Sequence, residues 1–120
     1  MDPDSSRTFI ELPTFTRQWS SLGFTDEQLS DLQQAILANP QGNPVVPGCA
    51  GFRKIRIAVA GKGKRDGARV LYADIPSVGI VILGVVFAKS RQADLTAAQR
   101  ENLVEQYRAL LLTLGIEYES

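Results

Sequence analysis

The fold of this chain is decided by residues 53–89, which read RKIRIAVAGKGKRDGARVLYADIPSVGIVILGVVFAK. At the start of this stretch Ile55, Ile57 and Val59 alternate with polar or small residues. A period of two is typical of a strand with one buried and one exposed side. We therefore predict a half-buried strand whose outer face is basic.

Two further strands are predicted in the same stretch. Residues 68–75 form the second strand. Valine and isoleucine dominate residues 78–89, and this near-continuous apolar run predicts a central strand that is covered on both faces. A glycine-rich connection at 60–67 and a turn at 76–79 separate the three strands.

The N-terminal part of the chain predicts a strand followed by helices. Residues 8–12 are a short strand candidate, and Pro13 suits the first turn of a helix that Gly23 ends. Residues 40–51 contain several prolines and glycines, so we expect an irregular connector before the three central strands.

Two capping boxes mark the starts of the other helices. Thr25 with Gln28, and Thr96 with Gln99, each have the spacing at which side chain and backbone exchange hydrogen bonds. Gly115 is a natural stop for the final helix, which places leucines at helical spacing. The predicted order is β-α-α-β-β-β-α, an α+β fold with helices packed on a mostly antiparallel sheet.

Length and composition predict a single domain in a reducing compartment. A chain of 120 residues is long enough to bury one core, so residues 1–120 are taken as one domain, with a disordered N-terminus at 1–6. Cys49 is the only cysteine, which favours the cytoplasm. The longest apolar run is too short to span a bilayer, so we expect no membrane association.

Charge is segregated along a chain whose net charge is zero. Residues 53–91 hold nine basic and two acidic residues, a net +7, and the remainder carries −7. Such segregation favours one basic face for an anionic partner, and nucleic acid is the first candidate. The alternative is a solvated hairpin whose lysines only maintain solubility.

The composition excludes several kinds of site. With one cysteine and no histidine, the chain has no zinc or copper constellation and no serine–histidine–aspartate triad. The absence of histidine also argues against Cys49 as an activated nucleophile. Residues 61–65, GKGKR, lack the glycine and hydroxyl spacing of a nucleotide-binding phosphate loop. No metal or other cofactor is expected.

Cationic chemistry on RNA is compatible with what remains. RNA supplies its own nucleophile, the 2′-hydroxyl, so the protein needs only to stabilise charge and move protons. Lys54 and Arg56 share one face of a strand, about 7 Å apart, which is comparable to one nucleotide step. Arg69 and Lys89 fall on the neighbouring strands, and we expect them to converge on the same groove.

The chain resembles the RelE/HigB-type toxins of bacterial toxin–antitoxin systems. The residues that carry the resemblance are 48–72, GCAGFRKIRIAVAGKGKRDGARVLY, and 86–96, VFAKSRQADLT, with the N-terminal FIELPTF in support. The resemblance implies a compact α+β toxin that cleaves messenger RNA in the ribosomal A site. It also implies a cognate antitoxin, usually a helix-turn-helix DNA-binding protein.

The resemblance assigns roles to the basic residues of this chain. The family relies on lysine, arginine and sometimes tyrosine for catalysis. By motif, the catalytic positions are Lys54, Arg56, Arg69 and Lys89. Contacts to the backbone of messenger or ribosomal RNA are expected from Arg53, Lys62, Lys64, Arg65 and Arg91.

Three positions depart from the family pattern. Phe87 stands where close relatives often have tyrosine, so no phenol is available there. Asp66 replaces a glycine and places a negative charge in the basic loop. Ser90 and Arg91 replace a common asparagine–glutamate pair. These changes leave the fold intact but put the catalytic rate in doubt.

Two other functions remain open. A ParE-like toxin that inhibits DNA gyrase without cleaving anything would share the fold. A plain RNA-binding module would normally expose aromatic side chains for stacking. The basic region contains only Phe52, Tyr72 and Phe87, and we expect at least two of them to face the core.

Overall fold

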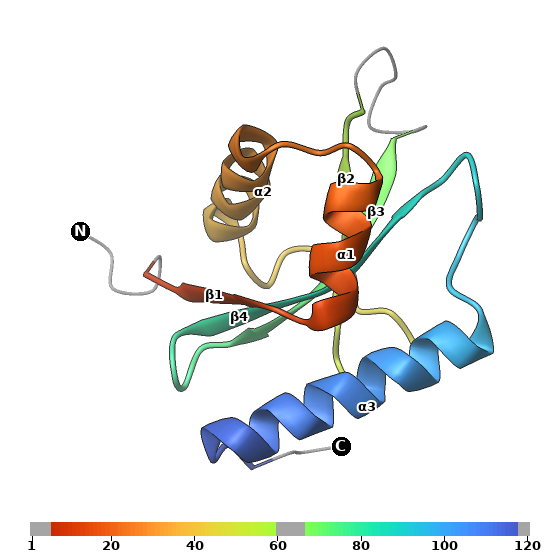
Figure 1. The fold of residues 1–120 in the computed structure, drawn as a ribbon. Helices are drawn as coiled ribbons and strands as arrows, with labels where there is room; N and C mark the ends of the chain where they lie inside the picture. The colour runs from red at the N-terminus through yellow and green to blue at the C-terminus, as the bar shows by residue number, and fades with distance from the viewer. Residues whose placement is uncertain (1–5, 60–66, 118–120) are drawn as a thin grey trace.

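The computed structural model describes residues 6–59 and 67–117, which contain a four-stranded sheet and three helices. Figure 1 shows α1 in front of the sheet, α2 at the upper left above β1 and β4, and the long α3 below the sheet. The elements, in chain order, are β1 (Thr8–Glu11), α1 (Pro13–Ser21), α2 (Asp26–Ala38), β2 (Arg53–Ile57), β3 (Ala68–Ile75), β4 (Ile80–Ala88) and α3 (Ala97–Leu114).

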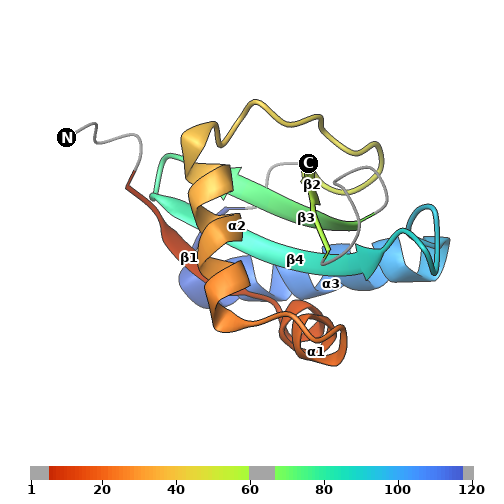
Figure 2. The ribbon, with the colours of Figure 1, turned by 90° about the horizontal axis from the view of Figure 1, so that it is seen from above.

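The sheet has the strand order β1-β4-β3-β2. β2, β3 and β4 pair antiparallel, whereas β1 pairs parallel with β4. The predicted α+β fold, with helices on a mostly antiparallel sheet, is confirmed. β4 and β3 are the interior strands (Figure 2), which explains why the apolar run near the end of the stretch is covered on both faces.

Side chains of the sheet alternate between two apolar clusters. On one face Val70 and Tyr72 of β3 pack with α1 and α2, through residues such as Trp19 and Leu32. On the other face Leu71 lies in the cluster that α3 covers. The period of two therefore divides the core into two layers, one on each side of the sheet.

A bulge at Gly84 lets α3 approach the sheet closely. Leu71 pairs with Val85 and Tyr72 pairs with Leu83, so Gly84 has no partner residue on β3. A Cβ atom at Gly84 would lie 2.6 Å from Leu103 Cδ1 of α3 and 2.6 Å from Phe52 Cε2. The missing side chain is therefore the space into which these two neighbours pack.

The predicted helix ends are confirmed. Thr25 Oγ1 accepts from the backbone N–H of Gln28 at 3.1 Å, and Gln28 Oε1 accepts from the backbone N–H of Thr25 at 2.8 Å. Thr96 and Gln99 make the same reciprocal pair, at 3.1 and 2.9 Å. Gly115 ends α3 with a φ of 72°, a left-handed conformation that glycine adopts without strain.

Some predicted boundaries are wrong. The third central strand begins at Ile80, because Val78 belongs to the preceding turn and is 48% exposed. The first central strand spans Arg53–Ile57 and stops short of Val59. Leu114 is one of the leucines at helical spacing in the last helix, but it is 40% exposed because it lies at the end of α3.

The irregular connector between α2 and β2 is confirmed, and polar contacts hold it. The Tyr72 hydroxyl donates to the carbonyl of Pro40 at 2.7 Å and accepts from Asn43 Nδ2 at 3.1 Å. At the same end of the sheet, Arg7 Nε donates to Asp74 Oδ1 at 2.8 Å. The expected disorder at residues 1–6 falls, apart from Ser6, outside the described residues.

Candidate nucleic-acid interface

Two arginines face each other across β2 and β3. Arg56 pairs with Arg69, and Arg69 pairs in turn with Phe87 of β4, so the three side chains form a row across one face of the sheet. The backbone N–H of Lys54 points away from β3 and donates to Pro44. Arg56, two residues on, has the same orientation, and pairs of this kind bring opposing side chains to within about 5 Å at Cβ.

Arg69 is the most deeply placed of these cations. Its exposed fraction is only 4%, which makes it the single polar or charged residue among the buried described residues. Its Nη1 donates to the backbone carbonyl of Ala68 at 3.3 Å. We expected Arg69 to converge on one groove with the other cations; instead it lies beneath the surface, because β3 is an interior strand.

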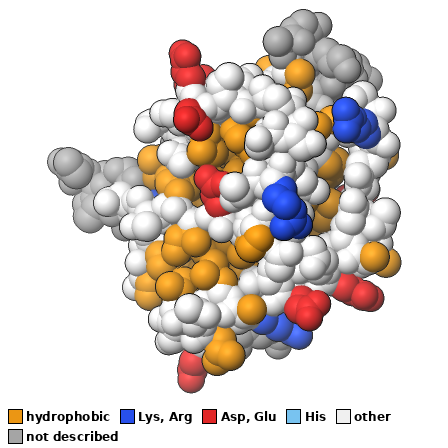
Figure 3. All heavy atoms as spheres, in the orientation of Figure 1, with side chains coloured by type: hydrophobic (Ala, Val, Ile, Leu, Met, Phe, Trp, Pro, Cys, Tyr) orange, Lys and Arg blue, Asp and Glu red, His pale blue; other side chains and the backbone are white. Residues whose placement is uncertain are grey.

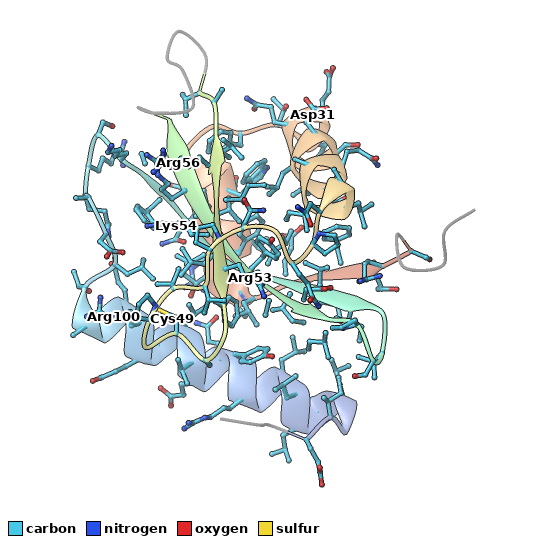
Figure 4. All side chains as sticks on the ribbon, turned by 180° about the vertical axis from the view of Figure 1, so that it is seen from behind. Asp31, Cys49, Arg53, Lys54, Arg56 and Arg100 are labelled. Carbon is cyan, nitrogen blue, oxygen red and sulfur yellow. The ribbon has the colours of Figure 1, made fainter. Side chains whose placement is uncertain are left out.

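Lys54 adds a second basic position to the same face. It pairs with Leu71, one step along β2 from the Arg56–Arg69 pair, and its side chain is half-buried. Phe52, earlier on the same face, contacts Tyr107 of α3 edge to face, with ring centroids 4.8 Å apart. Lys54 and then Arg56 thus lie progressively farther from α3, at the end of the face that α3 does not cover (Figure 4).

Lys89 and Arg91 follow the end of β4. Lys89 is exposed, and its backbone N–H donates to the Gly67 carbonyl at 3.0 Å. This places it at the end of the sheet where Ala68 pairs with Ala88, next to the Arg56–Arg69 row. Arg91 is also exposed, in the turn that follows. The structure therefore places Lys54, Arg56 and Arg69 on one face of the sheet, and Lys89 just beyond the end of β4 next to the Arg56–Arg69 row.

Arg53 is not brought together with them. It pairs with Tyr72 and lies on the opposite face of the sheet from Lys54. Its Nη1 donates to the Asn43 carbonyl at 2.7 Å, which ties the side chain to the connector. Of the other predicted RNA contacts, Lys62, Lys64 and Arg65 lie outside the described residues, as does Asp66.

Aromatic and thiol groups near this face are buried. Phe52 and Tyr72 have no exposed surface, and Phe87 is 4% exposed, so the expectation that at least two of them face the core is confirmed. Cys49 also has no exposed surface, and burial raises the pKa of its thiol, against a smaller lowering by Arg100. None of these four side chains offers a stacking surface or an accessible nucleophile.

Three exposed or half-buried cations near this face have no acidic partner in the described part of the chain. Within residues 6–59 and 67–117, Lys54, Arg56 and Lys89 make no ion pair, and Asp74 of β3 is engaged with Arg7. Figure 3 shows the face with α1 and α2, where Lys and Arg side chains are isolated among apolar, acidic and uncharged groups. The convergent cations therefore belong to the sheet face seen from behind in Figure 4.

A groove that the sequence did not predict adjoins the basic face. It separates α2 from β2, has a volume of about 780 Å³ and is lined by both apolar and polar residues, with Asp31, Lys54 and Arg56 as its charged ones. We call it the α2–β2 groove. No periodicity in the sequence reveals it, because it depends on how far α2 lies from the edge strand.

None of the described helices is long and apolar enough to cross a membrane.

The fold is similar to a solved toxin structure. No protein-family model matches the sequence. A structure described as a mutant of the Escherichia coli toxin RelE in the free state superposes with a TM-score of 0.58 at 20% sequence identity. The match covers 84% of this chain and 97% of that chain. At this identity, the likeness establishes a RelE-like fold.

Proposed function

We propose that this chain is the toxin of a toxin–antitoxin system and cleaves messenger RNA in the ribosomal A site. The observation that carries the proposal is the Arg56–Arg69 pair across β2 and β3, in which Arg56 is exposed and Arg69 is buried. Like charges that face each other across strands destabilise a sheet. A phosphate between them would remove the repulsion and turn the pair into a binding site.

The proposed cleavage uses the 2′-hydroxyl of the RNA as the nucleophile. It attacks the adjacent phosphorus, the bond to the 5′-oxygen breaks, and a cyclic phosphate and a 5′-hydroxyl are formed. Arg56 and Arg69 stabilise the negative charge that develops on the phosphorane oxygens. Lys54 and Lys89 are the proton-transfer candidates, because each lies beside this pair.

The surrounding cations are assigned to the RNA backbone. Arg91 lies beside Lys89 at the same end of the sheet and is exposed. The basic connection that contains Lys62, Lys64 and Arg65 leads from β2 into β3 and is assigned the same role. Arg53, on the other face, is the weakest of these assignments. The proposed partners are the ribosome, messenger RNA and a cognate helix-turn-helix antitoxin, all in the cytoplasm.

Primer-extension mapping of cellular transcripts after brief induction tests this function. The expected result is a set of new 5′ ends that keep a constant phase with codons and disappear when translation is blocked. Cuts that persist without translation would contradict action in the ribosomal A site. Intact transcripts with arrested DNA replication would contradict RNA cleavage and support the gyrase alternative.

A further inference from the structure

Aromatic rings lead from the core into the α2–β2 groove. Phe15 stacks on Trp19 with ring centroids 5.4 Å apart, and Trp19 stacks on Phe24 with centroids 4.3 Å apart. Phe15 has no exposed surface, whereas Trp19 and Phe24 line the groove and Phe24 is half-buried. Phe24 thus ends the stack at the groove, where another flat ring can pack against it.

Polar side chains of α2 line the same wall of the groove. Gln28, Asp31 and Ala35 are three to four residues apart, which places them on one side of the helix. Gln28 Oε1 accepts from the backbone N–H of Thr25 at 2.8 Å, and this bond does not use the N–H groups of the side chain. Asp31 is exposed, and no hydrogen bond or ion pair reaches it from the described part of the chain. The helix wall therefore offers a donor beside an anionic acceptor.

The opposite wall joins the groove to the basic face. Lys54 and Arg56 line the groove from β2 and also belong to the basic face. At Lys54 the connector covers the outer edge of the strand, because the backbone N–H of Lys54 donates to the Pro44 carbonyl at 3.0 Å. The backbone N–H of Arg56 also points outwards, since directions alternate along a strand, and no described residue accepts from it. As far as the described residues go, the groove and the basic face therefore meet at Arg56.

We propose that the α2–β2 groove holds one unstacked base of the RNA substrate, next to the phosphate at the Arg56–Arg69 pair. This inference rests on the function proposed above and names a subsite for it. The base stacks on Phe24, in the kind of contact by which proteins hold single-stranded RNA. The sugar–phosphate backbone crosses the edge of β2 at Arg56, whose backbone N–H and guanidinium both suit phosphate oxygens.

Charge fixes the orientation of the nucleotide. Asp31 repels a phosphate that enters the groove, whereas Lys54 and Arg56 attract it to the β2 side. The base is the uncharged part of a nucleotide, so the base occupies the groove. The size also agrees, because the volume of about 780 Å³ lies within the range of roughly 300–1,000 Å³ that is usual for sites of small ligands.

Asp31 also gives the site a preference among bases. A carboxylate only accepts hydrogen bonds, so it favours a base whose edge carries an amino group. Cytosine has an amino group where uracil has a carbonyl oxygen. Gln28, about one helical turn earlier, offers a donor for the ring nitrogen next to that amino group. We therefore expect the groove to bind cytosine more tightly than uracil.

NMR titration with short RNA analogues tests the site. Trp19 is the only tryptophan, and its Nε1 donates to the Thr25 carbonyl at 3.2 Å. Its indole N–H therefore gives a single resonance, which should move when a base stacks on the neighbouring Phe24. The probe is a cytidine dinucleotide whose 2′-hydroxyls are methylated, so that it cannot be cleaved.

The control for this titration is the same dinucleotide backbone without bases. We expect the cytidine probe to bind roughly tenfold more tightly than the control. Equal affinities would overturn the inference, because the phosphate alone would then explain the binding. Absence of binding by the cytidine probe would overturn it as well.

Two phenylalanines provide a matched pair of variants. Phe24 and Phe9 are both half-buried and pack against the same apolar cluster, but Phe9 does not line the groove. Phe24→Leu should weaken binding of the cytidine probe about tenfold, and Phe9→Leu should leave it unchanged. Equal losses in the two variants would assign the effect to packing of the core and overturn the stacking on Phe24.

Two aspartates of α2 provide the test of base preference. Asp31 lines the groove, whereas the equally exposed Asp26 does not. The native protein should bind the cytidine dinucleotide about tenfold more tightly than the uridine dinucleotide. Asp31→Asn should bind both about equally, and Asp26→Asn should keep the preference. A preference that survives in Asp31→Asn would overturn the role of this carboxylate.

Transcript mapping separates RNA from a free nucleotide as the source of the base. Cuts by the native protein should favour cytosine over uracil at one fixed position beside the cleaved bond, and Asp31→Asn should lose this preference. An unchanged pattern of cuts in Asp31→Asn would overturn the assignment to RNA and identify a free nucleotide as the ligand. The dinucleotide titrations involve no cleavage, so failure of the groove inference is distinguishable from failure of the proposed function.

Discussion

Arg56 lies directly opposite Arg69 in the pairing of β2 with β3, so two guanidinium groups share one face of the sheet. Replacing Arg56 by glutamine should therefore stabilise the folded protein by about 0.2–1 kcal/mol at low salt. The gain should shrink at high salt, where exposed charges are screened. Urea denaturation at two salt concentrations measures it. Arg17→Gln, on the exposed side of α1, is the control, and a loss of stability in Arg56→Gln would contradict close repulsion.

Removal of both Lys54 and Arg56 should abolish toxicity and RNA cleavage without unfolding the protein. Arg56 is exposed and Lys54 half-buried, so the double alanine variant should lose no more than about 1 kcal/mol of stability. Arg17→Ala with Arg108→Ala removes the same charge from two other exposed positions and should remain toxic. Growth after induction and thermal melts check both variants. Retained toxicity in the folded Lys54/Arg56 variant would exclude these side chains from the site.

Phe87→Tyr should raise the rate of RNA cleavage. Phe87 pairs with Arg69 on the basic face, so the new hydroxyl would lie near the proposed phosphate site. Because Phe87 is 4% exposed, an unsatisfied hydroxyl would cost about 1–3 kcal/mol of stability, and a melt should accompany the assay. Phe87→Leu controls for packing and should not raise the rate. No change in rate with tyrosine would assign this position to packing alone.

Gly84→Ala should destabilise the protein by about 1–3 kcal/mol. The added methyl group would lie 2.6 Å from an atom of Leu103 in α3 and 2.6 Å from an atom of Phe52, both of which pack against the bulge in β4. Shortening Leu103 to alanine in the same chain should relieve part of the strain, so the two costs should not add. Chemical denaturation of the two single variants and the double variant gives the comparison. Strict additivity would mean that the clash at Leu103 is not the cause.

Stability should decline in alkaline solution through two buried groups. Burial raises the pKa of Cys49 above its usual 9.0 and the pKa of Tyr72 above its usual 10.0. The folded state therefore holds both protons more tightly than the unfolded state. This contribution is fully present below pH 9 and is lost as the pH rises through the folded-state pKa values.

Urea midpoints at neutral pH and at about pH 10.5 should show the decline in the native sequence. Cys49→Ala and Tyr72→Phe each remove one titrating group, so each variant should lose less stability over the same interval. Tyr72→Phe starts from a lower value at neutral pH, because it also removes the hydrogen bonds to Pro40 and Asn43. An identical pH dependence in all three proteins would contradict the assignment.

Local signals in the sequence were enough to predict the element order. Capping boxes act within a few residues, and the alternation that begins at Ile55 needs only one strand, so both were confirmed. The strand order was not predicted, because the parallel pairing of Phe9 with Val81 joins segments far apart in the chain. The bulge at Gly84 could not be read from periodicity either, since it depends on contact with α3.

The basic face was predictable only in part. The period-two alternation of a strand correctly placed Lys54 and Arg56 on the same face. The same alternation places Arg53 on the other face, so Arg53 should not have been grouped with the other cations. The burial of Arg69 depends on β3 being an interior strand, which no local pattern in the sequence specifies. The roles of these residues in catalysis remain predictions.

The parallel pairing of β1 with β4 also determines when the sheet can be completed during synthesis of the chain. β1 is made early, but its partner strand emerges only after the rest of the sheet has been translated. At about 5–20 residues per second, Phe9 waits several seconds for Val81. The growing chain thus cannot complete the sheet behind Arg56 and Arg69 until β4 has left the exit tunnel. The finished basic face therefore forms only late in the synthesis of each chain.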